Sequence, residues 1–225
     1  MNGARIAFWP KKEQHQLFNL SFSAMMLALA LIASFVSHFI SIPFLSALKL
    51  TIDISSVFLI ACAFFVSYSW ALVITVALSL CSFIWDGNNW IGILTLTIAN
   101  FAIVSFTRLY FHIFAQIKLR WLWVFSLATL SNTLLLTTLN GLLITPLYWY
   151  WFGYVPTANF VEVAKIYNKT PYFHFFLFGV PNYWVGIFAL YSLFNVIKFT
   201  LVSLIGVPVM RAFQKFYWKK AQIVY

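Results

Sequence analysis

The sequence predicts an all-α integral membrane protein with six transmembrane helices. Of its 225 residues, 63% are hydrophobic and only 8% are charged, whereas charged residues make up about a quarter of a soluble domain. The apolar residues gather in segments that approach the roughly 20 residues a spanning helix needs. In a soluble protein the net charge of +10 would suggest nucleic-acid binding. Here the basic residues lie mostly between the apolar segments, which indicates orientation in a membrane instead.

Six apolar segments follow one another along the chain. They cover residues 17–40, 57–68, 70–85, 90–114, 119–149 and 183–210. The second and third are short, and the polar Ser67 and Ser69 with the aromatic Trp70 favour two helices over one long span. The stretch from Asp86 to Asn89 has the composition of a turn. Pro146 is expected to kink or end the fifth segment, and residues 151–181 are expected to form a long aromatic loop.

The basic residues are distributed unevenly between the two ends of these helices. If the N-terminus lies in the cytoplasm, ten of the 14 Lys and Arg residues fall on the cytoplasmic side, three fall outside, and Lys198 lies within the membrane. Positive charge accumulates on the cytoplasmic side of membrane proteins, so both termini are expected there. We expect one membrane domain over residues 1–225: an N-terminal segment (1–16), a six-helix bundle (17–210) and a basic cytoplasmic tail (211–225).

Lys198 is the most informative residue of the sixth segment. It stands 13 residues before Arg211, or about 20 Å along a helix, which places it near the middle of the membrane. A lysine at that depth costs several kcal/mol unless it faces a cavity, a partner or a ligand. Asn195 lies three residues earlier and therefore on the same helix face. This face is expected to line a binding site.

Three further polar residues fall at compatible depths. Asn100 and Asn140 lie inside the fourth and fifth segments, and Asp53 stands just before the second. With Asn195 and Lys198 they form a candidate substrate-binding set in the outer half of the bundle. The alternatives stay open, because a membrane asparagine often joins helices and an aspartate before a helix often caps it.

The sequence also indicates what is missing. Cys62 and Cys81 lie inside apolar segments without metal-ligand spacing, so neither a metal nor a cofactor is expected. Paired carboxylates, clustered histidines and a phosphate-binding loop are not found, and we predict a protein without enzymatic or ATPase activity. A self-sufficient secondary transporter usually has internal repeats and carboxylates in its helices. Neither is evident, and this class remains the alternative.

Several short motifs occur in order along the chain. They are Ala24-xxx-Ala28, Thr51-Ile52-Asp53-Ile54-Ser55-Ser56, Ala99-Asn100-Phe101, Leu139-Asn140 followed by Pro146-Leu147-Tyr148, and Phe194-Asn195-Val196-Ile197-Lys198. Together they resemble the substrate-binding (S) subunit of an energy-coupling factor (ECF) vitamin transporter of the riboflavin and pantothenate type. The likeness extends over residues 20 to 210.

This resemblance implies a high-affinity binding subunit for uptake of a water-soluble B-type vitamin through the plasma membrane of a bacterium. It implies a transmembrane coupling subunit, docked through Ala24 and Ala28, and two cytoplasmic ATP-binding subunits. Thr51 and Ser56 replace charged residues of the riboflavin motif, which favours another ligand. Pantothenate is preferred because its carboxylate suits Lys198; riboflavin or another vitamin is the alternative.

Overall fold

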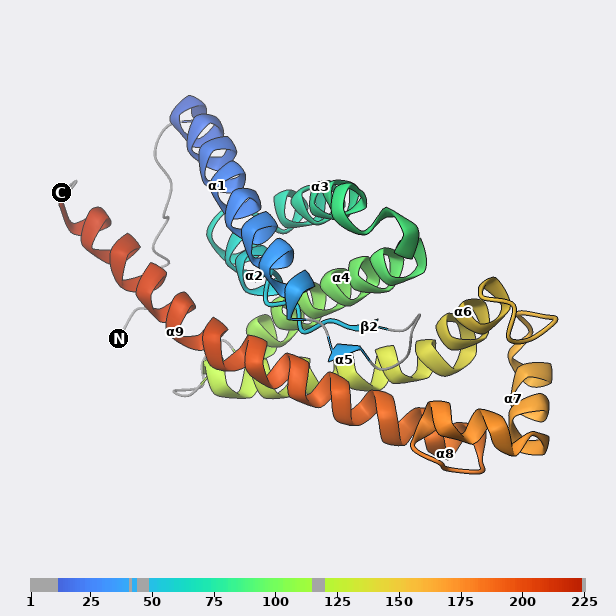
Figure 1. Cartoon of the computed structure of the whole chain (residues 1–225). Helices are drawn as coiled ribbons and strands as arrows, with labels where there is room; N and C mark the ends of the chain where they lie inside the picture. Colours follow the sequence, from blue (N-terminus) through green and yellow to red (C-terminus); the bar gives the residue numbers. More distant parts are fainter. Residues whose placement is uncertain (1–11, 41, 44–48, 115–119, 224–225) are drawn as a thin grey trace.

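The computed structural model describes residues 12–40, 42–43, 49–114 and 120–223 (Figure 1). Nearly all of the regular structure in this part of the chain is helical. The α-helices are α1 (Lys12–Phe39), α2 (Ser56–Phe65), α3 (Tyr68–Asp86), α4 (Trp90–Ile113), α5 (Arg120–Leu139), α6 (Thr145–Trp151), α7 (Phe160–Lys169), α8 (Tyr183–Ile187) and α9 (Leu193–Ile223). Two-residue strands β1 (Ile42–Pro43) and β2 (Lys49–Leu50) pair antiparallel, with Ile42 opposite Leu50.

Four stretches of this structure are long and apolar enough to cross a membrane: Gln16–Phe39, Tyr68–Ile113, Arg120–Trp151 and Tyr183–Lys215. The apolar helix α2 has only 10 residues. The predicted break between the second and third segments is present, because α2 ends at Phe65 and α3 begins at Tyr68. Ser67 caps α3 by accepting a hydrogen bond from the backbone N–H of Trp70 at 3.2 Å. The protein is a helical membrane protein; six crossings and cytoplasmic termini remain predictions.

Two of the long helices change register part-way. The π-helical segment η2 (Asn140–Ile144) joins α5 to α6, and η4 (Phe188–Ser192) joins α8 to α9. Pro146, expected to kink or end its helix, lies directly after η2, and the helix continues through it to Trp151. π-Helical turns are rare in proteins, and those that do occur often lie at functional sites. Here the two regions are connected, because Thr145, directly after η2, donates a hydrogen bond to the hydroxyl of Tyr191 in η4 at 3.0 Å.

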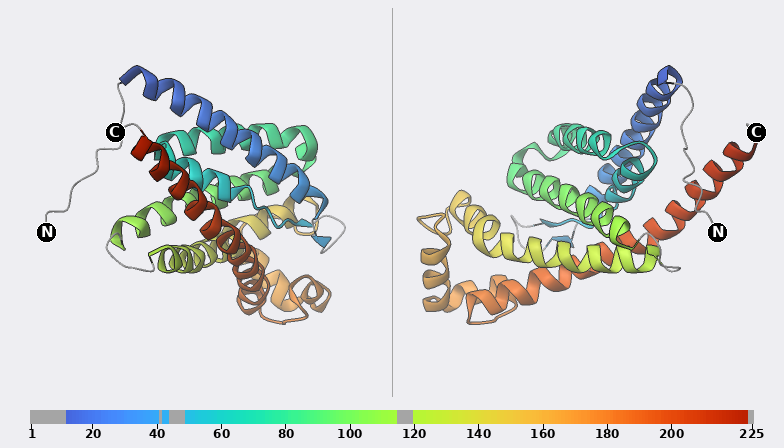
Figure 2. Two further views of the ribbon diagram at one scale, coloured as in Figure 1. Left: turned by 90° about the vertical axis from the view of Figure 1, so that its left-hand side faces the viewer. Right: turned by 180° about the vertical axis from the view of Figure 1, so that it is seen from behind.

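The main apolar core is shared by all the long helices. Met26, Ile60, Ile103, Phe125 and Val202 are fully buried in it, one each from α1, α2, α4, α5 and α9. Helix α4 packs against α3 and α5, and α5 packs against α9. Figures 1 and 2 show α9 running along most of the molecule, with its C-terminal end far from α6, α7 and α8.

A second core made of aromatic rings lies at the end of the molecule that carries α6 to α8. Trp149 stacks on Tyr167 with ring centroids 5.8 Å apart and also contacts Phe173 and Phe176. Burial raises the pKa of Tyr167 to about 12, so its hydroxyl remains protonated and donates to the carbonyl of Val180 at 2.5 Å.

The expected loop over residues 151–181 is therefore partly helical: it contains α7 and the 3-10 helix η3 (Pro171–Leu177). Asn159 caps α7 by accepting from the backbone N–H of Val161 at 2.9 Å. Val163 and Tyr167 lie four residues apart on one face and are both fully buried. Burial of this face against the aromatic core is what stabilises so short a helix.

Candidate ligand-binding cavity

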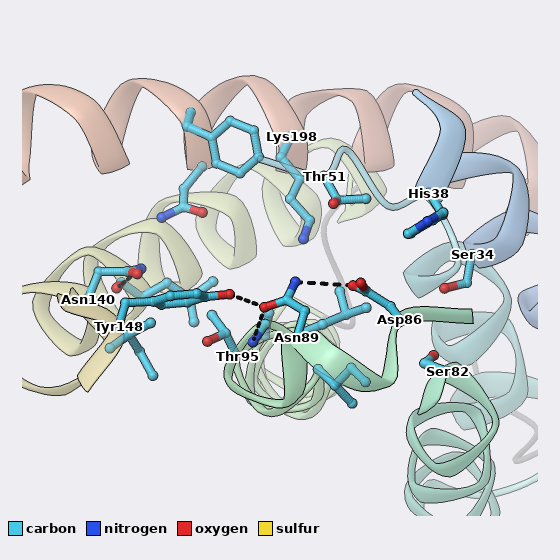
Figure 3. Close-up of a pocket in the computed structure, with 18 of the residues that line it drawn as sticks. Ser34, His38, Thr51, Ser82, Asp86, Asn89, Thr95, Asn140, Tyr148 and Lys198 are labelled. Carbon is cyan, nitrogen blue, oxygen red and sulfur yellow. Dashed lines mark hydrogen bonds between the residues drawn. The ribbon is translucent and has the colours of Figure 1, made fainter. Parts of the chain in front are cut away.

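A cavity of about 120 Å³ lies among α1, α3, α4, the η2 and η4 segments and α9 (Figure 3). Its lining includes apolar residues such as Ile93, Leu96 and Leu136. The polar and ionisable residues that line it are Ser34, His38, Thr51, Ser82, Asp86, Asn89, Thr95, Asn140, Tyr148, Tyr191, Asn195 and Lys198. A mostly apolar pocket with a few convergent polar groups is the usual form of a small-molecule site.

Lys198 reaches into this cavity from α9. Figure 3 shows its ammonium group extending away from the α9 backbone, towards Asn89 and Asp86 on the opposite wall. The residue is only 6% exposed, so its charge lies in a region of low dielectric. The nearby Asp53 carboxylate attracts the ammonium group electrostatically. An anion that entered the cavity would find here a largely desolvated partner.

Asn195 lines the cavity one helical turn before Lys198. It is 4% exposed, and its Nδ2 atom is buried without a hydrogen-bond partner among the described residues. An unpaired buried donor costs about 1–3 kcal/mol. Asn195 therefore offers, beside Lys198, a hydrogen-bond donor that the fold itself does not use.

Asn140 reaches the cavity from the first position of η2. Its Nδ2 atom donates to the carbonyl of Leu136 at 2.7 Å. This bond fixes the orientation of the amide, whose oxygen is a hydrogen-bond acceptor. Of the five residues in the predicted substrate-binding set, Asn140, Asn195 and Lys198 are thus brought together by the structure.

Asp53 and Asn100 do not line the cavity. Asp53 is fully buried and accepts hydrogen bonds from the backbone N–H and the hydroxyl of Ser55 at 2.7 and 2.8 Å. Asn100 is 1% exposed and accepts from the hydroxyl of Ser56 at 2.6 Å. These bonds fix the start of α2 and attach it to α4. Asp53 still influences the site indirectly, through its electrostatic attraction for Lys198.

The sequence did not single out the wall opposite Lys198. There, Asp86 ends α3, and Asn89 ends the short 3-10 helix η1 (Gly87–Asn89). Tyr148 donates its hydroxyl proton to Oδ1 of Asn89, which also accepts from the backbone N–H of Gly92 at 3.1 Å. Nδ2 of Asn89 in turn donates to Oδ2 of Asp86 at 3.1 Å. Asp86 and Asn89 were interpreted only as turn residues, since polar side chains are ordinary in a turn.

Tyr191 completes the cavity from η4. The residue is buried, and its hydroxyl oxygen accepts from Thr145, so its own proton is available. A π-helical turn in each of two neighbouring helices thus supplies a cavity residue, Asn140 from η2 and Tyr191 from η4.

The small-residue pair of α1 lies elsewhere. Ala24 and Ala28 are both exposed, whereas Met26, Ala30 and Ala33 on other sides of the same helix are buried in the core. Neither alanine lines the cavity. Among the described residues, nothing covers these two alanines, so this face of α1 is accessible to a helix of another protein. Within the part of the chain that the structure describes, no group of three or more His, Cys, Asp or Glu residues is arranged to hold a metal ion.

Comparisons with known proteins identify the fold and a close relative. No protein-family model matches the chain. The solved structure of the S component of a bacterial ECF transporter superposes with a TM-score of 0.60 over 89% of this chain and 98% of its own, at 18% identity. The predicted likeness to S subunits is thus confirmed for the fold. Uncharacterized protein MG350.1 of Mycoplasma genitalium is 64% identical over 221 residues, which cover 98% of this chain and 99% of that protein. The chain therefore belongs to the same family as MG350.1, and its fold is that of an ECF-transporter S component.

Proposed function

We propose that this protein is the membrane-embedded binding subunit of an ECF transporter and that it binds a small water-soluble vitamin in the cavity beside Lys198. The unpaired Asn195 donor next to a buried ammonium group is the observation that carries this proposal. A structural lysine or asparagine inside a membrane bundle is normally satisfied by other protein groups. Here Lys198 extends into a cavity that Asn195 also lines, so part of the free-energy cost of burying them would be recovered when a ligand binds.

The same observation favours an anionic ligand, and pantothenate is the vitamin we propose. Its carboxylate would accept from Lys198 and Asn195, which replaces the hydration lost by both partners with charge-assisted hydrogen bonds. Riboflavin, which carries no net charge, would add no counter-charge to that of Asp53 near the ammonium group. Riboflavin is therefore the second candidate. Binding without chemical change is the expected role of the site.

The direct test is to identify what the purified full-length protein binds. We expect native mass spectrometry to find pantothenate retained on the protein, and calorimetric titration of the emptied protein to give submicromolar affinity for it, a range that corresponds to more than about 8 kcal/mol. Tighter binding of riboflavin would refute the choice of pantothenate. Failure to bind any water-soluble vitamin would refute the function itself.

We further propose that the exposed Ala24 and Ala28 face of α1 receives the transmembrane coupling subunit, which works with two cytoplasmic ATP-binding subunits. Small residues four apart allow two helices to approach closely. The double substitution Ala24→Leu with Ala28→Leu is expected to abolish vitamin uptake in cells while leaving binding by the purified subunit unchanged. Ala189→Leu, at another exposed alanine, is the matched control and should transport normally.

Two results would contradict this assignment of partners. Normal uptake by the double variant would refute docking through α1. Uptake by vesicles that contain this chain alone would show a self-sufficient secondary transporter instead.

A further inference from the structure

The two walls of the cavity have opposite hydrogen-bonding character. On the α9 side, Lys198 and Asn195 present donors. On the side of the α3–α4 turn, Asp86 presents a carboxylate, and Figure 3 shows it facing the cavity across from the Lys198 ammonium. A ligand that fills the space between them meets both characters at once.

The hydrogen bonds of the turn leave its acceptors available. Asn89 occupies one acceptor position of Asp86, at 3.1 Å from Oδ2, whereas a carboxylate can accept about four hydrogen bonds. The hydroxyl of Tyr148 already donates its hydrogen bond to Asn89, so towards a ligand its oxygen can only accept. Asn89 in turn is fixed by Tyr148 and by the backbone N–H of Gly92. This wall is therefore held in place, and Asp86 and Tyr148 offer acceptors on it, while the Asn89 amide keeps one further N–H.

A purely structural role does not require the charge of Asp86. The bond from Asn89 needs only an oxygen acceptor, which an asparagine at position 86 would supply equally well. The whole chain contains only four acidic residues, and this one is partly buried beside a cavity. A partly buried carboxylate has lost some of its hydration, which is costly. Hydrogen bonds that a ligand donates to Asp86 would therefore contribute strongly to binding.

We propose that Asp86, positioned by Asn89 and Tyr148, forms a specificity subsite for hydroxyl or ammonium donors at the end of the ligand that lies away from its anionic group. This inference rests on the proposed function, because it assumes that the anion lies at Lys198. The ligand class is then an anion at one end with hydrogen-bond donors at the other. A molecule with negative charge at both ends is rejected, because its second anion would face Asp86.

The subsite is tested with two probes and three proteins. The probes are pantothenate, which has two hydroxyl groups far from its carboxylate, and its analogue with both hydroxyls replaced by hydrogen. The proteins are the full-length wild type, Asp86→Asn, and Glu162→Gln on the exposed face of α7 as the control for loss of one negative charge. Asp86→Asn keeps an oxygen acceptor for Asn89, removes the charge, and replaces the second carboxylate oxygen by an amide NH2 group.

Calorimetric titration should separate a ligand contact from a structural effect. We expect Asp86→Asn to weaken pantothenate binding about fivefold to tenfold, the difference between a charged and a neutral hydrogen bond. Binding of the dihydroxyl-free analogue should change by less than about twofold, and Glu162→Gln should change neither. Equal weakening of both probes would overturn the subsite, because Asp86 would then act through Lys198 or the fold. Unchanged binding of both would also overturn it.

Failure of the proposed function gives a different result. If the wild type binds neither probe, the molecule identified on the purified protein by mass spectrometry replaces pantothenate in the titration. An anion with distant hydroxyl or ammonium donors, bound more weakly by Asp86→Asn, would support the subsite. A neutral molecule, or an anion without such donors, would overturn it.

Discussion

Two groups of buried polar side chains, one at the start of α2 and one on α9, differ in their hydrogen bonds and in their position relative to the cavity. Asp53 and Asn100 are buried, but each accepts hydrogen bonds from a serine at 2.8 Å or less. Asn195 and Lys198 are buried to a similar degree, yet Asn195 leaves a donor unpaired and Lys198 extends into a cavity. Burial alone therefore does not distinguish a binding residue from a residue of the scaffold. The hydrogen-bond partners and the position relative to the cavity together separate the two groups.

The largest effect on stability is expected where the satisfied group contains a charge. Asp53→Ala removes the acceptor of two Ser55 donors and the negative charge that attracts Lys198. Since two buried Ser55 donors lose a charged acceptor, we expect destabilisation by about 3 kcal/mol, measured by detergent-induced unfolding in mixed micelles. The exposed Glu162→Ala should change stability by less than about 0.5 kcal/mol. A loss below about 1 kcal/mol for Asp53→Ala would remove the contrast between the two groups.

The group that lines the cavity should instead respond in ligand binding. Lys198→Met keeps the length and apolar stem of the side chain and removes its charge. We expect the affinity for pantothenate to fall at least about tenfold, or about 1.4 kcal/mol, the scale of a charged hydrogen bond. Titration of the purified variant measures this. Unchanged affinity would return Lys198 to a structural role and would contradict the proposed site.

A smaller stability effect is expected at the neutral bond between α2 and α4. Ser56→Ala leaves Oδ1 of Asn100 without its donor, and we expect a cost of about 1 kcal/mol. In the Asn100→Ala background the same substitution should cost clearly less, since the two residues share one bond. Unfolding of both single variants and the double variant completes the cycle, and Ser69→Ala on the exposed start of α3 serves as the control. Additive costs would show that the bond contributes little.

The smallest effect on stability is expected at Asn195. Asn195→Leu replaces an unpaired buried donor with an apolar group of similar size. We expect the stability of the ligand-free protein to stay the same or to rise by up to about 1 kcal/mol, while pantothenate binding weakens. A destabilisation comparable to that of Ser56→Ala would mean that Asn195 belongs to the scaffold.

Much of the helical architecture could be predicted from local signals. The expected segments at residues 70–85 and 90–114 correspond to α3 at Tyr68–Asp86 and α4 at Trp90–Ile113, because apolar length and turn residues determine helix ends locally. The π-helical turns η2 and η4 could not be predicted, since their residues have no distinctive pattern. Helix α7 was missed because its short apolar face becomes stable only against the aromatic core.

The residues of the candidate site also divide into those that the sequence indicated and those that only the structure revealed. Lys198 and Asn195 stood out in the sequence because polar groups within a spanning helix are costly wherever they point. Asp86 and Asn89 did not stand out, since their roles depend on the position of α9 relative to the α3–α4 turn. Asn100 and Asp53 looked equivalent to Asn195 until their serine partners were located.

By itself, the sequence determined that this chain forms apolar helices in a membrane and that one helix carries an expensive polar face. Both follow from the free energy of moving each residue out of water, which depends on residue type and local order. Only the tertiary structure decided which polar groups satisfy one another and which remain directed into the cavity. That outcome depends on distances between helices far apart in the chain, and hydrogen bonds form or fail within a fraction of an ångström.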